Sequence, residues 1–508
     1  MSEVVYGGRG LVPRTAGFER RAWEKREVIE NFSSGDLTGD LILGEGIGLS
    51  FAKHPEWAYE RNANVMVVAG SGQGKTRSVV LPNLINHLPA NYVVTDTKGE
   101  LQRATADGFR ADGYEVQVLD TIKPERSCCI NPFAYIEKES DIPLFADLLL
   151  DAVNEGQLFS NGKNGDFWDN TARMLFEAII GLCFSMEELD GKFSSEWKGG
   201  SEPRYLNLEH ILKLVDMVAV GDDEGRTIVS PLDILVNQLS NGFIGKSVFH
   251  DGMHVRFASK NDSFGVRQYR AFKSAANRTL KSIIISLHAS LYKLRTPEMK
   301  RLFDHDELDI MNIDCGKRVI YLAMSDNVST NAFVGRLVFK LLLNKALLKA
   351  DSQPNGKLAK PVLFLCDEFA NLGKLGDFER AISITRSRNI AFLMCIQSIN
   401  QLGWVYGADR ARIIMDNCDT LAFLGSGSTY ESARYFSDLC GDAVFGTSRV
   451  GVEGTEKDIT DRLMSASDIS RLPREDCIIK ISGVGPYLTK KYDVRRHPNA
   501  EKFLRLPD

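Results

Sequence analysis

Short apolar runs, separated by amphipathic segments, dominate two stretches of the chain. The runs are rich in Val, Ile, Leu and Phe, which is typical of parallel strands covered on both faces. They lie at residues 65–68, 92–95, 115–119, 318–324, 362–366, 390–396, 420–424 and 477–481. The segments between them have helical periodicity at residues 77–87, where Pro82 predicts a kink or a restart, and at 101–111 and 330–349. The pattern predicts an α/β fold with a largely parallel sheet, and the glycine-spaced residues 44–51 fit an edge strand.

The pattern changes between residues 141 and 301. Strand-like runs disappear there, and apolar residues recur at the spacing of helices. Helices are predicted at residues 142–153, 167–184, 206–218, 231–239 and 272–294. We therefore expect five regions: an N-terminal arm (1–40), the first part of an α/β domain (41–140), an all-α insertion domain (141–301), the second part of the α/β domain (302–490) and a polar C-terminal tail (491–508).

Composition narrows the class of protein. The 508 residues are too many for one simple core. A balance of 62 Lys and Arg against 67 Asp and Glu gives a net charge of −5, so a nucleic acid would need a local basic surface or a channel formed by several subunits. The nine cysteines are scattered, without CxxC spacing or a Cys/His cluster of zinc type, which favours a reducing compartment. The cysteine pattern therefore suits the cytoplasm, and no stretch approaches about 18 consecutive apolar residues, so we expect no membrane span within this sequence.

Residues 64–76 (NVMVVAGSGQGKT) join a buried strand to a glycine-rich turn. In a P-loop, backbone N–H groups surround the α- and β-phosphates of ATP, a lysine reaches the β- and γ-phosphates, and a hydroxyl holds Mg²⁺. Here the loop residues are Gly70, Ser71, Gly72, Gln73, Gly74, Lys75 and Thr76. Ala69 replaces the first glycine of the strict pattern, but the three glycines keep the backbone freedom that the turn needs. The preceding strand and the following apolar segment favour this interpretation over a chance Lys-Thr pair, so we expect a nucleotide-binding domain with ATP and Mg²⁺ as its ligands.

Acidic and amide side chains follow three of the other apolar runs. A strand that ends in two acids is the Walker B arrangement, in which Asp367 reaches the water shell of Mg²⁺ and Glu368 polarises the attacking water. Gln397 ends the run at residues 390–396 and is expected to contact the γ-phosphate or that water. Asp96 follows the run at residues 92–95, where it either orders water around Mg²⁺ or caps the next turn.

A second glycine–lysine–serine segment occurs at residues 240–247 (SNGFIGKS). It follows a helical pattern instead of a buried strand, and it holds only two glycines. We interpret it as a chance match to the P-loop.

Together these motifs resemble the type IV secretion coupling proteins, the TraG-like ATPases of conjugation and effector export. The match runs in order over roughly residues 44–492 and is most specific at residues 367–373 (DEFANLG). The other matching segments are LPNL (81–84), DTKGEL (96–101), NPF (131–133), FWD (167–169) and LP (472–473). The resemblance implies a RecA-like P-loop NTPase domain with an inserted all-α domain, assembled as a ring-shaped hexamer that uses ATP hydrolysis to pass DNA–protein substrates into a secretion channel.

The resemblance also implies partners and a location. The expected partners are single-stranded or double-stranded DNA, relaxase or effector proteins, and secretion-channel ATPases or a membrane adaptor. A homohexamer is the expected active form, with a monomer as the alternative for the isolated chain. Members of the family commonly carry N-terminal transmembrane helices, so we expect peripheral attachment at the inner face of the cell membrane, through a partner or through an anchor missing from this sequence. Thr97 replaces the proline usual in the family's DPKGE motif.

An arginine acting across the subunit interface is a further expectation. Arg386 has the spacing to Gln397 that the resemblance favours, and Arg388 is the second candidate. The alternative is that both arginines lie on a solvated helix face or contact DNA phosphates.

Two other functions use the same motifs. One is an ATP-dependent DNA translocase for segregation or packaging, which the DEFANLG segment and the long helical insertion disfavour. The other is a receptor that binds ATP without hydrolysing it, which Glu368 disfavours because a receptor does not need a general base.

Overall fold

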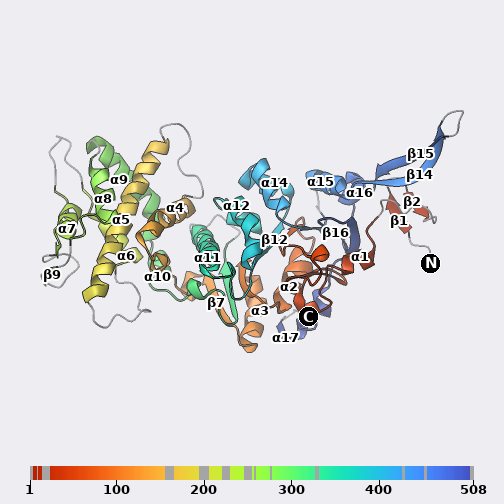
Figure 1. The fold of residues 1–508 in the computed structure, drawn as a ribbon, viewed down its shortest axis with the longest axis horizontal. Helices are drawn as coiled ribbons and strands as arrows, with labels where there is room; N and C mark the ends of the chain where they lie inside the picture. Colours follow the sequence, from red (N-terminus) through yellow and green to blue (C-terminus); the bar gives the residue numbers. More distant parts are fainter. Residues whose placement is uncertain are drawn as a thin grey trace. The chain divides into compact units, whose positions relative to one another are not determined.

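The computed structural model describes residues 4–7, 10–13, 23–154, 165–193, 205–219, 229–244, 255–256, 259–274, 277–325, 331–425, 430–450 and 455–503. The chain forms two compact units (Figure 1). Unit 1 comprises Met1–Val118, Asn312–Asp326 and Lys345–Asp508, and unit 2 comprises Leu119–Met311 and Asn327–Asn344. The predicted domain boundaries at residues 40, 140, 301 and 490 stay a prediction beside these two units.

A nine-stranded sheet is the centre of unit 1 in the described part of the chain. Its order is β17-β16-β13-β5-β12-β11-β6-β10-β7. The strands are β5 (Val65–Val68), β6 (Asn91–Asp96), β7 (Glu115–Asp120), β10 (Arg318–Ala323), β11 (Val362–Cys366), β12 (Ile390–Ile396), β13 (Thr420–Phe423), β16 (Asp476–Ile481) and β17 (Pro486–Lys490). All residues of β5, β6, β10, β11, β12 and β13 are buried, which explains their continuous apolar runs.

The middle of this sheet is parallel. Strands β10, β6, β11, β12, β5 and β13 pair in parallel, whereas β16 and β17 add antiparallel strands at one side. In register, Cys366 lies opposite Thr95 on β6 and Met394 on β12, while Ile396 lies opposite Val68 on β5. The carboxyl ends of four neighbouring strands therefore meet at one edge of the sheet, and the predicted α/β class is confirmed.

Helices and hairpins surround the sheet of unit 1. The helices are α1 (Arg26–Glu30), α2 (Leu81–Ile85), α3 (Glu100–Ala111), α12 (Phe378–Thr385), α13 (Ile399–Tyr406), α14 (Ala408–Asp416), α15 (Tyr430–Cys440), α16 (Ala466–Ser470) and α17 (Ala500–Phe503), and α11 (Ala332–Ser352) belongs to both units. The hairpins are β1–β2 (Val4–Gly7, Gly10–Pro13), β3–β4 (Asp40–Gly44, Ile47–Ser50) and β14–β15 (Asp442–Val450, Thr455–Arg462). The core of unit 1 also buries Ile29 and Phe32, which precede β3.

Two local predictions in unit 1 are resolved by this structure. The strand predicted at residues 44–51 is present as β4, but it pairs with β3 in a separate hairpin instead of lying at the edge of the main sheet, because Gly46 has a φ of 69° and turns the chain there. The segment after the P-loop begins as a π-helical turn over Thr76–Val80 and continues as α2, with Pro82 in the first turn of α2. The predicted restart near Pro82 is confirmed, since a proline fits the first turn of a helix.

Unit 2 is mostly helical. Its helices are α4 (Ile142–Val153), α5 (Gly165–Phe193), α6 (Leu208–Asp216), α7 (Pro231–Ser240), α8 (Phe264–Lys273), α9 (Asn277–Leu291) and α10 (Pro297–Leu302), with the short strands β8 (Phe243–Ile244) and β9 (Val255–Arg256). Helix α5 packs against α4, α6, α8 and α9 (Figure 1). Helix α9 confirms most of the helix predicted at residues 272–294, but its predicted start is wrong, because residues 272 and 273 end α8 and α9 begins at Asn277.

Two motifs from the sequence fall partly beyond what the structure describes in unit 2. The P-loop-like residues 240–247 follow helix α7, and their last three residues lie outside the described part. The side chains of residues 167–169 lie outside it as well.

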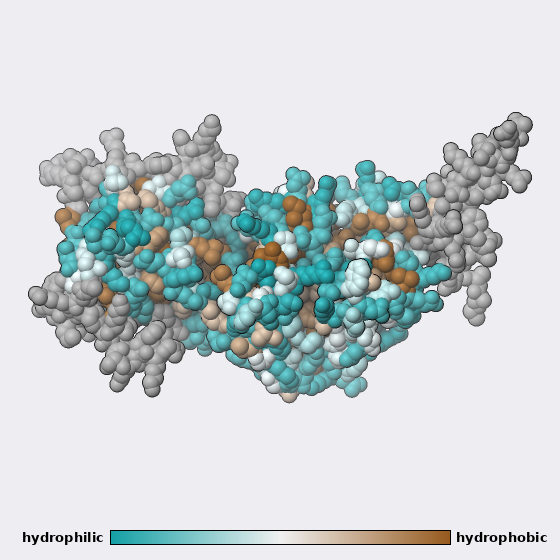
Figure 2. All heavy atoms as spheres, in the orientation of Figure 1, coloured by the Kyte–Doolittle hydropathy of each residue, from teal (hydrophilic) through white to brown (hydrophobic). Residues whose placement is uncertain are grey.

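Polar residues cover most of the described surface in Figure 2, and apolar residues form small separate patches. The most exposed large apolar side chains include Trp57 and Trp404. Among the helices that the structure describes, none has the length and apolar character needed to cross a bilayer.

Candidate nucleotide-binding site

The P-loop follows β5 in the middle of the sheet. Gly72 and Gly74 have φ angles of 73° and 85°, a conformation that only glycine adopts readily. The Gly70 N–H donates to the Gly425 carbonyl at 2.8 Å, which ties the loop to the end of β13. Ala69 is fully buried and does not have a positive φ, so its methyl group is tolerated where the strict pattern has glycine.

The two Walker motifs meet at the carboxyl edge of the sheet. Lys75 Nζ forms an ion pair with Glu368 Oε2. The Thr76 hydroxyl donates to Asp367 Oδ1 at 2.9 Å. The structure therefore brings the P-loop cation and hydroxyl into direct contact with the two acids that follow β11.

Glu368 is buried in this site, with 4% of its surface exposed. Its Oε2 also accepts a hydrogen bond from Gln397 Nε2 at 3.2 Å, so Gln397 lies beside the acid as predicted. Its Oε1 is buried and has no hydrogen-bond partner among the described residues. A buried carboxylate oxygen without a donor is costly, unless a water or a ligand supplies one.

These side chains surround a pocket of about 420 Å³. The lining residues are Ser71, Gly72, Lys75, Thr76, Asp96, Thr97, Lys98, Glu100, Leu101, Asp367, Glu368, Asn371 and Gln397. Asp96 Oδ2 accepts the Gln102 N–H at 2.8 Å, so this carboxylate both lines the pocket and caps the start of α3. Both alternatives considered for Asp96 are thus compatible with its position.

The electrostatics of the pocket favour a cation beside the acids. Burial raises the pKa of Asp367 to about 6, although the Thr76 hydrogen bond and the Lys75 charge oppose this shift. Burial also raises the pKa of Asp96, and the backbone N–H groups of Gln102, Leu101, Lys98 and Glu100 oppose this shift. Two buried carboxyl groups with raised pKa values in one pocket create a strong demand for positive charge.

The pocket therefore fits ATP and Mg²⁺. The P-loop provides backbone N–H groups and a lysine for phosphates, and Thr76 and Asp367 provide the hard oxygen ligands that Mg²⁺ prefers. Glu368 Oε1, which has no donor in the described part of the chain, can accept a hydrogen bond from a water molecule.

Arg386 is not brought into this pocket. Its guanidinium lies 3.3 Å from Glu60 Oε1, and 54% of its side chain is exposed. Arg388 contacts Asp351 at 2.8 Å. Neither arginine lines the pocket of its own chain, so the role of Arg386 across an interface stays a prediction.

Two cations at the P-loop were not predicted from the sequence. Arg474 Nη2 donates to the Gly72 carbonyl at 3.0 Å, and Lys491 Nζ donates to the Gln73 carbonyl at 2.9 Å. Burial lowers the pKa of Lys491 to about 8. Both residues lie far along the chain from the loop that they contact, and no local pattern marks them, although Leu472-Pro473 of the family resemblance is adjacent to Arg474.

Comparisons with known proteins agree with this geometry. The family described as "Type IV secretory system Conjugative DNA transfer" matches residues 17–492. Among curated proteins, Protein VirD4 of Agrobacterium fabrum is 23% identical over 388 residues, covering 75% of this chain and 50% of that protein. Conjugal transfer protein TraG of Rhizobium radiobacter is 24% identical, covering 83% of this chain and 60% of that protein. The chain thus spans about half of the length of these relatives.

Solved structures support the fold. The bacterial conjugative coupling protein TrwBdeltaN70 in its unbound monoclinic form has a TM-score of 0.62 at 14% identity, over 96% of this chain and 95% of that chain. The plasmid coupling protein TrwB in complex with ADP and Mg²⁺ has a TM-score of 0.61 at 14% identity, over 94% and 96%. This likeness confirms the predicted fold class, a RecA-like P-loop NTPase domain with an inserted helical domain. Because the family match extends over nearly the whole chain, this protein belongs to the type IV secretory system conjugative DNA transfer family, the coupling proteins.

Proposed function

We propose that this chain is an ATP-hydrolysing coupling protein of a type IV secretion or conjugation system. It recruits DNA–protein or effector substrates and drives them toward the transfer channel. Membership of the family supports this proposal, together with a pocket in which five predicted site residues meet: Lys75, Thr76, Asp367, Glu368 and Gln397.

The position of Glu368 carries the hydrolytic part of the proposal. A receptor that only binds ATP does not need a buried carboxylate with one oxygen available beside the P-loop lysine. Lys75 pairs with Glu368 in the structure, so the phosphates of ATP must replace Glu368 as the partner of Lys75. Glu368 is then released to accept the proton of the water that attacks the γ-phosphate, giving ADP and phosphate.

The other residues orient this reaction. Thr76 and Asp367 would hold Mg²⁺, which neutralises phosphate charge when bound. Gln397 donates to Glu368 and keeps that carboxylate directed at the γ-phosphate position. Arg386 supplies a further cation to the site of a neighbouring subunit, and a homohexamer at the inner face of the cell membrane is the assembly in which this occurs.

Purified protein provides the test. We expect ATP turnover that rises on addition of single-stranded or double-stranded DNA and is abolished by Lys75→Ala. Tight ATP binding without turnover would support the receptor instead.

The proteins that bind this chain in the cell test its proposed cellular role. A pull-down from cells that contain the secretion system, with mass-spectrometric identification, is expected to recover a relaxase or secreted effector together with a secretion-channel ATPase or a membrane adaptor. Recovery of chromosome-segregation or packaging proteins in their place would support the DNA translocase.

A further inference from the structure

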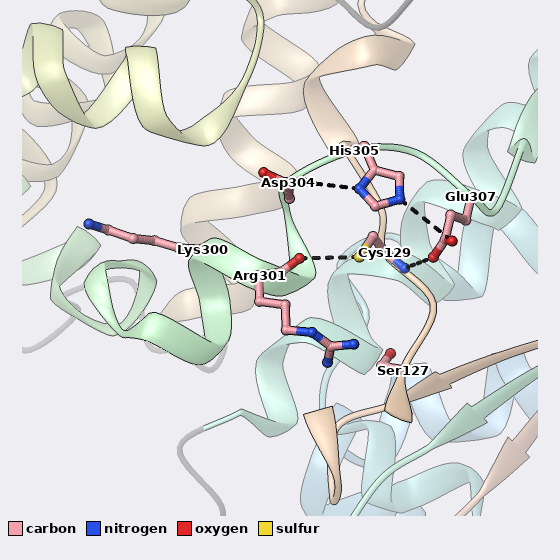
Figure 3. Close-up of a pocket in the computed structure, with 7 residues that line it drawn as sticks. All are labelled: Ser127, Cys129, Lys300, Arg301, Asp304, His305 and Glu307. Atoms are coloured by element: carbon pink, nitrogen blue, oxygen red, sulfur yellow. Dashed lines mark hydrogen bonds and ion pairs between the residues drawn. The ribbon is translucent and has the colours of Figure 1, made fainter. Parts of the chain in front are cut away.

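Unit 2 brings a thiol, an imidazole and a carboxylate together in a second pocket. Figure 3 shows Cys129, His305 and Glu307, whose sulfur, nitrogen and oxygen ligand atoms all lie within 4.8 Å of one another. Cys129 is buried and Glu307 is exposed, so the group reaches from the interior to the surface. The pocket has a volume of about 540 Å³, and Ser127, Lys300, Arg301 and Asp304 complete its lining.

Backbone hydrogen bonds hold the two segments of this group in place. The Glu307 N–H donates to the Cys129 carbonyl at 3.1 Å, and the Cys129 N–H donates to Glu307 Oε2 at 2.6 Å. The Ile130 N–H donates to the Leu302 carbonyl at 2.8 Å. The thiol of Cys129 and the side chains after α10 are thus positioned by the fold itself, which lowers the entropy cost of binding an ion between them.

The imidazole has the orientation that metal sites require. His305 Nδ1 lies 3.1 Å from Asp304 Oδ2, which leaves Nε2 directed at Glu307 Oε1 at 3.5 Å (Figure 3). In metalloproteins a carboxylate on one ring nitrogen fixes the tautomer, so that the other nitrogen binds the metal. Glu307 is fixed in the same way, because its Oε2 accepts the Cys129 N–H while Oε1 faces the imidazole.

The distances match a tetrahedral ion of moderate size. Metal–ligand bonds of ~2.0 Å to nitrogen and oxygen and ~2.3 Å to sulfur place tetrahedral ligands ~3.3–3.5 Å apart. The 3.5 Å between His305 Nε2 and Glu307 Oε1 already fits this geometry. The Cys129 sulfur contacts the Arg301 carbonyl at 3.2 Å and lies within 4.8 Å of the other two ligand atoms.

We propose that Cys129, His305 and Glu307 form a zinc-binding site. A mixed S, N, O ligand set favours Zn²⁺ over Mg²⁺ or Ca²⁺, which prefer oxygen ligands alone. The site keeps a fourth position toward the pocket for a water molecule or an external ligand. A thiolate and the carboxylates of Asp304 and Glu307 would supply three negative charges, which exceed the two positive charges of the ion and partly offset those of Lys300 and Arg301. The bound ion joins two segments of unit 2 that are 178 residues apart.

Metal content and spectroscopy of the full chain test the proposal. Metals are first removed with a chelator, and the chain is then titrated with Zn²⁺ in the absence of nucleotide. We expect one tightly bound Zn²⁺ per chain. Co²⁺ in place of Zn²⁺ should give the charge-transfer absorption of a thiolate–cobalt bond. Cys129→Ser should abolish this absorption, and His305→Gln should weaken the affinity for Zn²⁺ by at least ~10-fold.

Matched controls separate binding from loss of structure. His288→Gln removes an imidazole that lies 3.9 Å from Asp216 in the same unit, and Cys315→Ser removes an exposed thiol; both should leave the stoichiometry and the spectrum unchanged. If Cys129→Ser unfolds, His305→Gln remains decisive, because 43% of the His305 side chain is exposed. Less than one Zn²⁺ per wild-type chain, a Co²⁺ spectrum without the thiolate band, or an equal loss in the control variants would overturn the proposal.

Discussion

Glu368 has two partners on one carboxylate oxygen and none that the structure describes on the other. Lys75 and Gln397 both contact Oε2, while Oε1 is buried without a donor. Under the proposed function, ATP competes with this ion pair for Lys75. The proposal therefore assigns Glu368 opposite effects on the two steps: it opposes ATP binding and promotes hydrolysis.

Glu368→Gln is expected to reduce ATP turnover by ~10²–10⁴-fold, the usual contribution of a general base. Its affinity for ATP should equal or exceed that of the wild type, because the neutral amide no longer pairs with Lys75. Equilibrium binding of a fluorescent ATP analogue and single-turnover hydrolysis measure the two effects. Near-normal turnover would mean that the base lies elsewhere.

Two further substitutions serve as a loss-of-function reference and a neutral control for Glu368→Gln. Lys75→Ala should lose both binding and turnover, since the phosphates lose their main cationic partner. Glu431→Gln, on the exposed first turn of α15, should change neither quantity.

His497 gives unit 1 a pH-dependent stability. Burial, and secondarily the charge of His87, lower its pKa to about 4. Its Nδ1 accepts the Asn499 N–H at 3.1 Å and its Nε2 lies 3.1 Å from Asn86 Oδ1, so both nitrogens are used by the neutral ring. Because the folded pKa lies below the unfolded value of about 6.5, the stabilisation is complete above that value and is lost as the pH falls toward 4.

We expect the free energy of unfolding of unit 1 to fall by about 2 kcal/mol from this residue between about pH 7.5 and about pH 5. Urea unfolding at both pH values measures the change. His497→Gln should lower stability at the higher pH and should show a smaller loss on acidification. An unchanged pH dependence in the variant would assign the effect to other groups.

At the scale of elements, the positions of the sheet's strands along the chain could be predicted from the sequence. Which strands pair with one another could not. Buried parallel strands are apolar throughout, so β5, β11 and β12 can be located within a residue or two from composition alone. The order of the strands depends on long-range packing, and the antiparallel strand β17 is only partly buried and leaves no such run. The break between α8 and α9 was missed because helical periodicity continues across it.

The crossing of α5 and α8 depends on two glycines that sequence periodicity does not explain. A methyl group added to Gly181 would lie 2.7 Å from the Cα of Gly265, closer than packed atoms approach. Helices that meet at such a point have no room for a side chain, so any addition must push them apart.

Gly265→Ala is expected to destabilise unit 2 by about 1–3 kcal/mol through this overpacking. Gly403→Ala is the matched control, because a methyl group there meets nothing within 4 Å in helix α13. It should be neutral or stabilising by about 0.5–1 kcal/mol. Thermal unfolding of both variants and of the wild type measures these effects. A Gly265→Ala midpoint equal to that of the wild type would show that the two helices can move apart without loss of stability.

At the scale of the molecule, the meeting of the candidate site residues was predictable because one rule of sheet geometry places them. Residues after neighbouring parallel strands converge at one edge of a sheet, so the apolar runs alone are enough to group Lys75, Asp367 and Gln397. Arg474 and Lys491 contact the loop from positions far along the chain, and no local sequence pattern predicts such long-range contacts. Cys129 and His305 were missed for the same reason, since a metal cluster is recognised in sequence by close spacing.

The assembly prediction concerns Arg386, which lies outside its own pocket and is half-exposed. If it acts on a neighbour's ATP, Lys75→Ala and Arg386→Ala chains should each be inactive but should regain turnover when mixed. Some interfaces in the mixture then pair an intact P-loop with an intact arginine. ATPase activity across mixing ratios provides the measurement, in oligomers shown to contain both chains.

Arg388→Ala, the second candidate, is tested in the same mixtures, and recovery with Arg388→Ala in place of Arg386→Ala would assign the role to Arg388. Full activity of Arg386→Ala alone, or no recovery in mixed oligomers, would remove Arg386 from the site.

The position of β5 between β12 and β13 has a consequence for biosynthesis. The P-loop strand leaves the ribosome early, whereas its two neighbours begin only at Ile390 and Thr420. At ~5–20 residues per second, this apolar strand waits roughly 15–65 s for a partner. All of unit 2, which ends at Asn344, is synthesised during this interval. The candidate nucleotide-binding site is then among the last parts of the nascent chain to form, and the unpaired strand is exposed to aggregation until then.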